Sequence, residues 1–473
     1  DLPIMVAVCL LCVPLFLTGR RLSRAEGTLM VAGYAVFRRD EPGYEAARRA
    51  TVWNGRTPER FPDLVVQAVS EDDVVAAVRT ARDEGLRIGV RSGGHSWAGN
   101  HLRDGGLLLD CSRLDTMTVD AEAMTATVQP GCRGNEVLAA LAAQDRFFPA
   151  GHCPGVALGG YLLQGGFGWN GRVHGPACMS VEAIDVVTAA GELVRADATE
   201  HPDLFWAARG SGPGFFGAVT RFYLRLQPLP KVIANGVCLY PADVLDEVFR
   251  WAHELGPSVP RTMEFMLLTH RNAAGEAEIA VTGPVLVDTE EEARAALALL
   301  ETCPVLDRAT LSVPYVPATF ADLYAGVHEA YPDGHRYATD NMWTHAPIDD
   351  LLPGLRRIAE TLPGAPSHML WMNWSPDHPR TPPRPDMAYS VEDEIYIALY
   401  AIWQDPARDA VNAAWPREHM AAMAPLASGI QLADENLGER PARFLSDEHY
   451  ARYDAIRAAY DPDGRFHTWM GRP

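Results

Sequence analysis

Residues 61–94 read FPDLVVQAVSEDDVVAAVRTARDEGLRIGVRSGG, and this stretch decides the fold class. It opens with a short apolar strand, and Ser70 followed by Asp73 predicts the N-cap of a helix. Val74 and Val78 continue that helix as an apolar stripe, because residues four apart share one helical face. A second apolar run then leads into a doubled glycine. The strand–helix–strand order predicts an α/β organisation.

The sequence pattern changes after residue 230, where the prolines of GAVTRFYLRLQPLP end a predicted strand. Long alternating segments follow, such as MEFMLLTH, HMLWMNW and EIYIALYAIW, together with helical segments such as DTEEEARAALALLE. They predict an antiparallel sheet with helices on one face. The helical tail SDEHYARYDAIRAAYDP is expected to return to the first domain. The predicted units are an N-terminal segment (1–40), a first domain (41–230, completed by 431–473) and a second domain (231–430).

The N-terminal segment contains an apolar run, IMVAVCLLCVPLFL, over residues 4–17. Fourteen residues are too few to cross a bilayer comfortably, so no stable membrane insertion is expected. The length suits a signal-peptide core, but the arginines follow the run instead of preceding it. A secretion or anchoring signal, a buried element and a non-native leader all remain open. Cytoplasmic and secreted locations therefore both remain open, with the cytoplasm favoured.

Composition excludes several classes of partner. The formal net charge of −20 argues against nucleic acid or an anionic membrane as the main partner. The eight cysteines are scattered, without two matching C-x-x-C pairs, so we predict neither a structural zinc site nor a disulfide framework. No metal is predicted, and the expected partner is a small molecule.

Two glycine-rich loops stand out from this background. Residues 90–99 read VRSGGHSWAG, a turn that can aim successive backbone N–H groups at a pyrophosphate. Residues 149–175 read PAGHCPGVALGGYLLQGGFGWNGRVHG, far richer in glycine than a hairpin requires. The spacing of Gly166, Gly168 and Gly171 matches G-x-G-x-x-G, but no clean strand leads into it, so a Rossmann domain is disfavoured. A plain loop-rich connector is the alternative.

Taken together, these loops and their flanking segments resemble the berberine bridge enzyme-like flavoproteins. Those proteins belong to the vanillyl alcohol oxidase / p-cresol methylhydroxylase superfamily. The resemblance runs from about Trp53 to Leu226, including RDGGLLLDCSRLD and VQPGCRGNEVLAAL, and resumes weakly in the C-terminal helix. It implies an α/β (α+β) fold, with a two-subdomain FAD-binding domain of the p-cresol methylhydroxylase type. The second domain is then a substrate domain whose antiparallel sheet is covered by helices.

The resemblance also implies FAD bound through two covalent links, from His95 to the flavin 8α-methyl group and from Cys153 to flavin C6. A lone histidine is otherwise most often a hydrogen-bonded surface residue, and a lone cysteine a small buried hydrophobe. HGPACMS and GPGFFGAVT depart from the family pattern near the adenine and phosphate end. Further cofactor-binding residues implied by the resemblance are Arg91, Ser92, Gly93, Gly94, Ser96, Gly151, His152, Val156, Gly159, Gly160, Gly165, Gly166, Gly168, Gly175 and Val219.

The catalytic base cannot be transferred from the family. Its members often carry a Tyr-x-Asn motif near the C-terminus, where this chain has IQLADENLGE. We therefore searched the late strand VEDEIYIALYAIW, one face of which alternates Glu392, Glu394, Tyr396, Ala398, Tyr400 and Ile402. Tyr396 is the favoured base, followed by Tyr400 and Glu394, if an arginine or lysine nearby lowers the tyrosine pKa. His368 and Glu264 are the alternatives, and the face could also simply meet solvent.

These residues predict an FAD-dependent oxidase acting on an alcohol or a phenolic or sugar-type substrate, in secondary or carbohydrate metabolism. Hydride passes to flavin N5, and O2 reoxidises the flavin to give hydrogen peroxide. In the family, the residue three after the tethering cysteine resembles an oxygen gate, and here it is Val156, smaller than leucine. The alternatives are a dehydrogenase with another acceptor and a catalytically inactive flavin-binding module.

Overall fold

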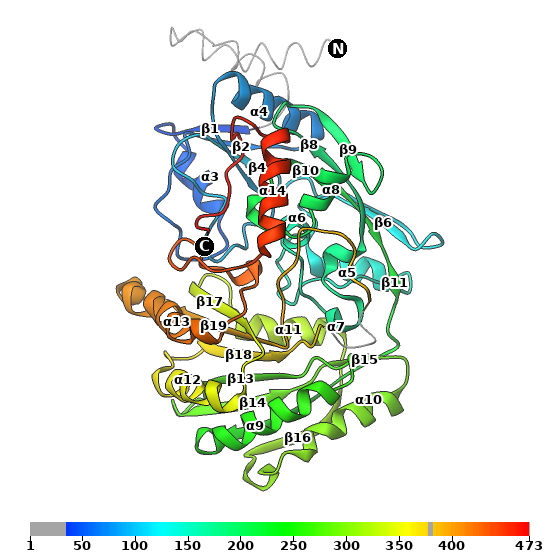
Figure 1. Cartoon of the computed structure of the whole chain (residues 1–473), viewed down its shortest axis with the longest axis vertical. Coiled ribbons are helices and arrows are strands. Elements are labelled where there is room, and N and C mark those ends of the chain that lie inside the picture. The colour runs from blue at the N-terminus through cyan, green and yellow to red at the C-terminus, as the bar shows by residue number, and fades with distance from the viewer. Residues whose placement is uncertain (1–34, 377–381, 473) are drawn as a thin grey trace.

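The structure is a computed structural model that describes residues 35–376 and 382–472 of the 473-residue chain. Within these ranges, three large β-sheets and a two-stranded ribbon form two halves stacked along the long axis of the molecule (Figure 1). This mixed arrangement of helices and sheets confirms the predicted fold class. The apolar run 4–17 lies outside the described residues. No helix within the described ranges is long and apolar enough to cross a bilayer.

The first sheet contains the strand–helix–strand unit predicted from residues 61–94. Its strands, in spatial order, are β1 (Ala35–Arg38), β2 (Leu64–Gln67), β4 (Leu107–Asp110) and β3 (Ile88–Arg91), with helices α3 (Tyr44–Ala50) and α4 (Glu71–Asp83). β2 and β3 both run parallel to β4, so α4 provides the crossover that parallel strands require. The cap at Ser70 is confirmed as a capping box with Asp73. β1 pairs with β2, although its residues fall within the predicted N-terminal segment.

The second sheet is antiparallel and completes the same half of the molecule. Its strands, in spatial order, are β5 (Met117–Asp120), β6 (Thr125–Val128), β10 (Ala218–Arg225), β8 (Val181–Val187) and β9 (Leu193–Asp197). β7 (Arg146–Phe147) and β11 (Gln227–Pro228) form the ribbon, and the helices nearby are α5 (Gly134–Ala142), α6 (Leu158–Leu163), α7 (Gly171–His174) and α8 (Pro202–Ala207). The second glycine-rich loop thus surrounds α6 and α7.

The third sheet forms the other half and is antiparallel throughout, as predicted. Its strands, in spatial order, are β15 (Val285–Val287), β12 (Val232–Pro241), β14 (Ala277–Thr282), β13 (Met266–Arg271), β18 (His368–Asn373), β19 (Ile395–Trp403) and β17 (Arg336–Thr344), with β16 (Leu311–Pro317) also paired to β12. The associated helices are α9 (Leu245–Leu255), α10 (Glu290–Leu297), α11 (Phe320–Ala330), α12 (Ile348–Thr361) and α13 (Asp409–Met423). Residues of α9, α10, α12 and α13 share one hydrophobic core with the outer face of the sheet, whereas α11 lies on the opposite, inner face (Figure 1).

The two faces of β19 have different surroundings. Ile395, Ile397 and Leu399 pack into the core beneath the helices, as the alternation predicted. Tyr396 and Tyr400 belong to a separate aromatic cluster on the inner face, where both are buried, so the interpretation that this face meets solvent is wrong. Glu392 and Glu394 precede the strand, so the alternation does not extend to them. The inner face therefore points toward the first half of the molecule.

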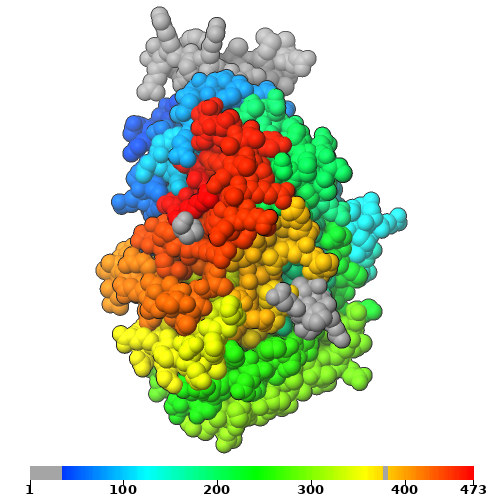
Figure 2. Space-filling model, in the orientation of Figure 1, coloured from blue at the N-terminus to red at the C-terminus, as the bar shows by residue number. Residues whose placement is uncertain are grey.

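The C-terminal residues return to the first half, as predicted. Tyr453 and Ile456 of α14 (Asp447–Tyr460) are buried in the core of that half. The chain then forms a parallel bridge between Phe466 and Ile88 of β3, and the Trp469 indole N–H donates to the Ser211 carbonyl at 2.8 Å. Figure 2 shows this segment, in red, packed over the N-terminal half.

Candidate active site

A cavity of about 560 Å³ lies between the loops of the first half and the inner face of the third sheet. Its lining combines residues from both glycine-rich loops with residues from the sheet, from the loop 431–434 and from the C-terminal segment. A cavity of this size is typical of a cofactor or small-molecule site. Its position between two packed halves brings together residues that are hundreds of positions apart in the sequence.

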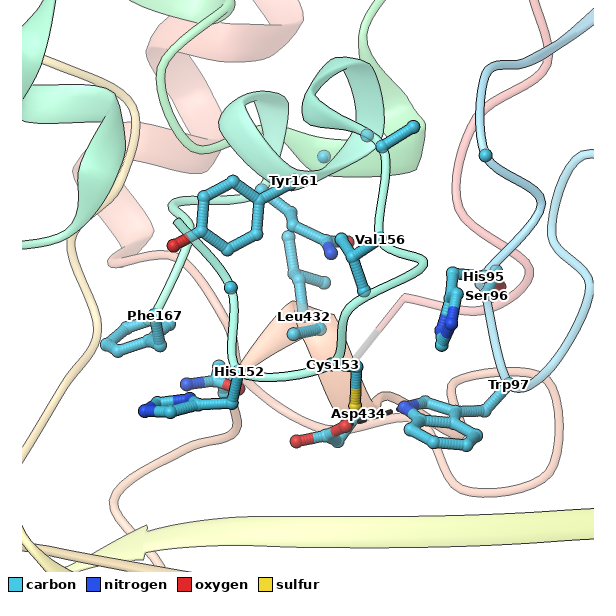
Figure 3. Close-up of a pocket in the computed structure, with 18 of the residues that line it drawn as sticks. His95, Ser96, Trp97, His152, Cys153, Val156, Tyr161, Phe167, Leu432 and Asp434 are labelled. Atoms are coloured by element: carbon cyan, nitrogen blue, oxygen red, sulfur yellow. Dashed lines mark hydrogen bonds between the residues drawn. The ribbon is translucent and has the colours of Figure 1, made fainter. Parts of the chain in front are cut away.

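His95 and Cys153, the two predicted tethers, enter this cavity from different loops (Figure 3). The His95 ring stacks on Trp53 with 4.1 Å between ring centroids, and burial lowers its pKa to about 4. Its imidazole is therefore neutral at pH 7 and keeps a free lone pair. Burial raises the pKa of Cys153 to about 12, with a further contribution from the charge of Asp434, so its side chain is a thiol at pH 7.

Most of the predicted cofactor-binding residues line the cavity. Besides the two tethers they are Arg91, Ser92, Gly93, Gly94, Ser96, Gly151, His152, Val156, Gly159, Gly160 and Val219. Gly165, Gly166, Gly168 and Gly175 do not line it. A Cβ at Gly166 would lie 2.8 Å from the Tyr161 ring, and one at Gly168 would lie 2.1 Å from the Ala150 carbonyl oxygen. These two glycines allow close packing of the loop itself.

The lining residues fit a flavin nucleotide. A Cβ built on Gly160 would find no atom within 4 Å, so a ligand can approach the backbone there. His101 also lines the cavity, and its buried Nε2 has no hydrogen-bond partner within the described part of the protein. Burial lowers the His101 pKa to about 3, so the ring is neutral and offers a polar atom to a ligand.

A buried carboxylate, Asp434, is the polar centre of the cavity wall. Its Oδ1 accepts a hydrogen bond from the Trp97 indole N–H at 2.6 Å, drawn as a dashed line in Figure 3. Its Oδ2 accepts from the hydroxyl groups of both Tyr396 and Tyr400, the latter at 2.9 Å. Burial raises the pKa of Asp434 above the ordinary value of 3.8, although the three donors counteract this effect.

The tyrosines beside Asp434 are neutral donors. Burial, followed by the charge of Asp434, raises the pKa of both Tyr396 and Tyr400 well above 10. Among the described residues, the charged group that most affects the Tyr396 pKa is Asp434. The Tyr396 hydroxyl forms a hydrogen bond with that carboxylate and with no arginine or lysine of the described chain, so the expected cation is not found there. Glu394 does not line the cavity, and its charge instead acts on the buried guanidinium groups of Arg172 and Arg261.

Asp434 was not predicted from the sequence, although it lies in the stretch IQLADENLGE. Nothing in the local sequence distinguishes this aspartate from the neighbouring Glu435. Leu432 and Leu437 flank both acidic residues, so the sequence holds no signal that singles out Asp434. Its hydrogen-bond donors, which a buried carboxylate requires, come from distant parts of the chain.

Asn341 of β17 holds the loop that carries Asp434. Its side-chain amide donates to the carbonyl oxygens of Gln431 (3.0 Å) and Asp434 (2.8 Å), and its Oδ1 accepts the Gln431 N–H (2.8 Å). The neighbouring Asp340 forms a buried ion pair with Arg440 beyond the loop. The loop is thus fixed at both ends against the third sheet.

The two alternative bases, Glu264 and His368, are each separated from the cavity by a side chain that lines it. Glu264 is buried. Its carboxylate is hydrogen-bonded to His152 Nε2 at 2.8 Å and accepts a hydrogen bond from the Asn170 N–H at 2.6 Å. His152, in contrast, lines the cavity. The buried His368 accepts a hydrogen bond from the Tyr331 hydroxyl at 2.9 Å, and burial lowers its pKa to about 4. Neither Glu264 nor His368 lines the cavity.

Comparison with known proteins identifies the cofactor. The FAD binding domain family matches residues 62–197. The FAD-linked oxidoreductase nodO of Hypoxylon pulicicidum is 34% identical over 427 residues, covering 89% of this chain and 93% of that protein. The xylooligosaccharide oxidase of Thermothelomyces thermophilus is 39% identical over 199 residues, covering 40% of each chain. The structure of the BBE-like 1 protein of Physcomitrella patens superposes with a TM-score of 0.81 at 19% identity, covering 95% of this chain and 99% of that one.

The three hydrogen bonds of the Asn341 side chain should stabilise the folded protein. Replacing Asn341 with leucine leaves two backbone carbonyls and one N–H buried without partners, so we expect a loss of about 2–4 kcal/mol in the free energy of unfolding. Urea denaturation would measure it. Asn436→Ala is the control, because its only side-chain hydrogen bond to the described residues, to Asp340, is 3.4 Å long. Equal effects of the two substitutions would contradict the role given to Asn341.

Proposed function

Because the chain belongs to the FAD-linked oxidoreductases of the vanillyl alcohol oxidase / p-cresol methylhydroxylase family, we propose that it is an oxidase with bicovalently bound FAD. Its substrate is an alcohol or a phenolic or sugar-type compound. When bound, FAD accepts a hydride from the substrate carbon and delivers the electrons to O2, which gives hydrogen peroxide. The proposal rests mainly on one observation: His95, Cys153 and Asp434 all line the same cavity. The hydrogen-bond donors of Asp434, which are Trp97, Tyr396 and Tyr400, line it too, and we call these four residues the Asp434 cluster.

The tethering roles of His95 and Cys153 are supported by their chemistry and placement. His95 carries a neutral ring nitrogen that can bond carbon, and its stacking on Trp53 fixes the orientation of the ring. Cys153 follows His152 in the second loop, and its sulfur lies beside Asp434 and Trp97 (Figure 3). Two links from separate loops would hold the ring in a cavity that is also open to substrate.

Proton removal is assigned to Tyr396 together with Asp434. A neutral tyrosine whose pKa is raised is a poor base by itself, so its own proton must have an acceptor. The Tyr396 oxygen takes the substrate hydroxyl proton while its own proton passes to Asp434 Oδ2, which becomes a carboxylic acid. The raised pKa of Asp434 favours this transfer. Tyr400 donates to the same oxygen and keeps it in place.

The assignment as an oxidase is supported by Val156. This half-buried side chain lines the cavity three positions after Cys153 and is one methylene shorter than leucine. Because protein interiors are closely packed, one methylene decides whether a molecule as small as O2 has access. In a dehydrogenase, a larger side chain such as leucine would be expected at this position and would exclude O2.

The covalent links can be tested on denatured protein. We expect acid-precipitated wild-type protein to retain its yellow flavin, and His95→Ala and Cys153→Ala each to retain it through the remaining link. The double variant should release the flavin into the supernatant. Absorbance of pellet and supernatant, with mass spectrometry of the flavin peptides, measures the outcome. Complete release from the wild type would exclude covalent attachment.

The proton transfer can be tested by pH dependence. Since Asp434 must be ionised, kcat/KM should fall as the pH drops through a pKa above 3.8, and the raised tyrosine pKa values predict no alkaline limb below pH 10. Asp434→Asn and Tyr396→Phe should each lower kcat by about 10²–10⁴-fold. The flavin spectrum is the control for folding. Full activity of Asp434→Asn would move the proton acceptor elsewhere.

The reaction with O2 can be tested at Val156. Val156→Leu should slow flavin reoxidation at least about tenfold in stopped flow, because the added methylene fills the space that O2 requires. Anaerobic reduction by substrate should change little. Val156→Ala is the matched control and should reoxidise as fast as the wild type. Slow reoxidation of the wild type itself would favour the dehydrogenase.

A further inference from the structure

The cavity continues beyond Tyr396 along the inner face of the third sheet. Met372 pairs with Tyr396, Met266 pairs with Met372, and Thr282 pairs with Met266, so these residues form one row across β19, β18, β13 and β14. All four line the cavity. Neighbouring strands lie about 4.8 Å apart, so three steps carry this row about 14 Å away from Tyr396.

The floor of this extension is apolar. Leu268 of β13 and Leu370 of β18 are directly opposed, and each lies two residues along its strand from Met266 and Met372, respectively. Both leucines also line the cavity. Side chains of directly opposed residues project from the same face of a sheet, so the four form a continuous surface. The two methionines are unbranched and adapt to irregular shapes.

One face of α11 forms the opposite wall. Leu323, Val327 and Ala330 line the cavity, and their spacing places them on one side of the helix. Asp322 and Gly326 also line it but are exposed, so the extension opens to solvent beside them. Both ends of the extension are therefore polar. The Asp434 cluster lies at one end, and Asp322 and Thr282 lie at the other.

We propose that this extension, bounded by the two rows of the sheet and by α11, binds the body of an elongated apolar alcohol. An isoprenoid or long alkyl alcohol matches its length and its apolar walls, with the hydroxyl group directed to Tyr396 and Asp434. A sugar chain does not match, because its hydroxyl groups would be buried against methionine and leucine side chains without partners. This substrate class rests on the oxidase function proposed above.

Gly326 allows a direct test. A Cβ at this position meets no atom within 4 Å, so a side chain can start there without a clash, and a tryptophan would narrow the extension. A glycine in the middle of a helix is unfavourable, so the substitution should not weaken α11. Ala325 is exposed, points away from the lining face and does not line the cavity. Ala325→Trp is therefore the matched control.

Benzyl alcohol, geraniol, farnesol and cellobiose serve as substrates. We expect kcat/KM to rise with length, about fourfold for each additional buried methylene, and cellobiose to be the poorest substrate. Gly326→Trp should lower the ratio of kcat/KM for farnesol to that for benzyl alcohol by about tenfold or more. Ala325→Trp should leave the ratio within about twofold of the wild type.

Binding of farnesyl methyl ether, which has no hydroxyl proton to lose, is measured separately by its effect on the flavin absorbance. Tight binding that is weakened by Gly326→Trp supports the extension even if no alcohol is oxidised, an outcome that would count against the oxidase function alone. Oxidation that does not depend on chain length, equal effects of the two tryptophan variants, or a preference for cellobiose would each overturn the assignment of an apolar substrate.

Discussion

The carboxylate of Asp434 is the constraint on which the arrangement of the cavity depends. A buried charge is costly unless it is hydrogen-bonded, and this one has donors from two distant parts of the chain. Trp97 belongs to the first glycine-rich loop, whereas Tyr396 and Tyr400 belong to the third sheet. The two halves must therefore stack in one relative position for the carboxylate to be satisfied. The same stacking encloses the cavity.

Asp434 is itself held by the return of the chain to the first half. Asn341 fixes the loop from the side of the sheet, and the C-terminal segment after α14 joins the first sheet beside β3. Both attachments use backbone hydrogen-bonding groups, so they depend little on the side chains of the loop. Such a frame allows the polar residue in the loop to differ while its position stays fixed. In this way a chain without the tyrosine motif expected from the family resemblance still places a carboxylate in the cavity wall.

Local patterns predicted much of this structure, and long-range contacts account for what they missed. The capping box at Ser70 and the alternation along β19 depend only on neighbouring residues, and both were predicted. Glu394 was misplaced because alternation does not define where a strand begins. Asp434 was missed because its partners lie 34 to 337 positions away, and no local pattern reports such contacts. Some glycines of the second loop line the cavity and others allow close backbone packing, and only the three-dimensional structure separates the two groups.

In the proposed reaction, substrate binding and proton transfer would be coupled through the third sheet. Met372 and Tyr396 are opposed neighbours on adjacent strands, so the row that would contact the body of a substrate would also position the phenol proposed to take its proton. Binding energy from the remote part of a substrate can then be used to align its hydroxyl group, which raises kcat as well as affinity. A substrate that lacks this body would bind the polar end without being aligned. In such a sheet, selectivity for substrate length and the rate of the chemical step follow from the same cross-strand register.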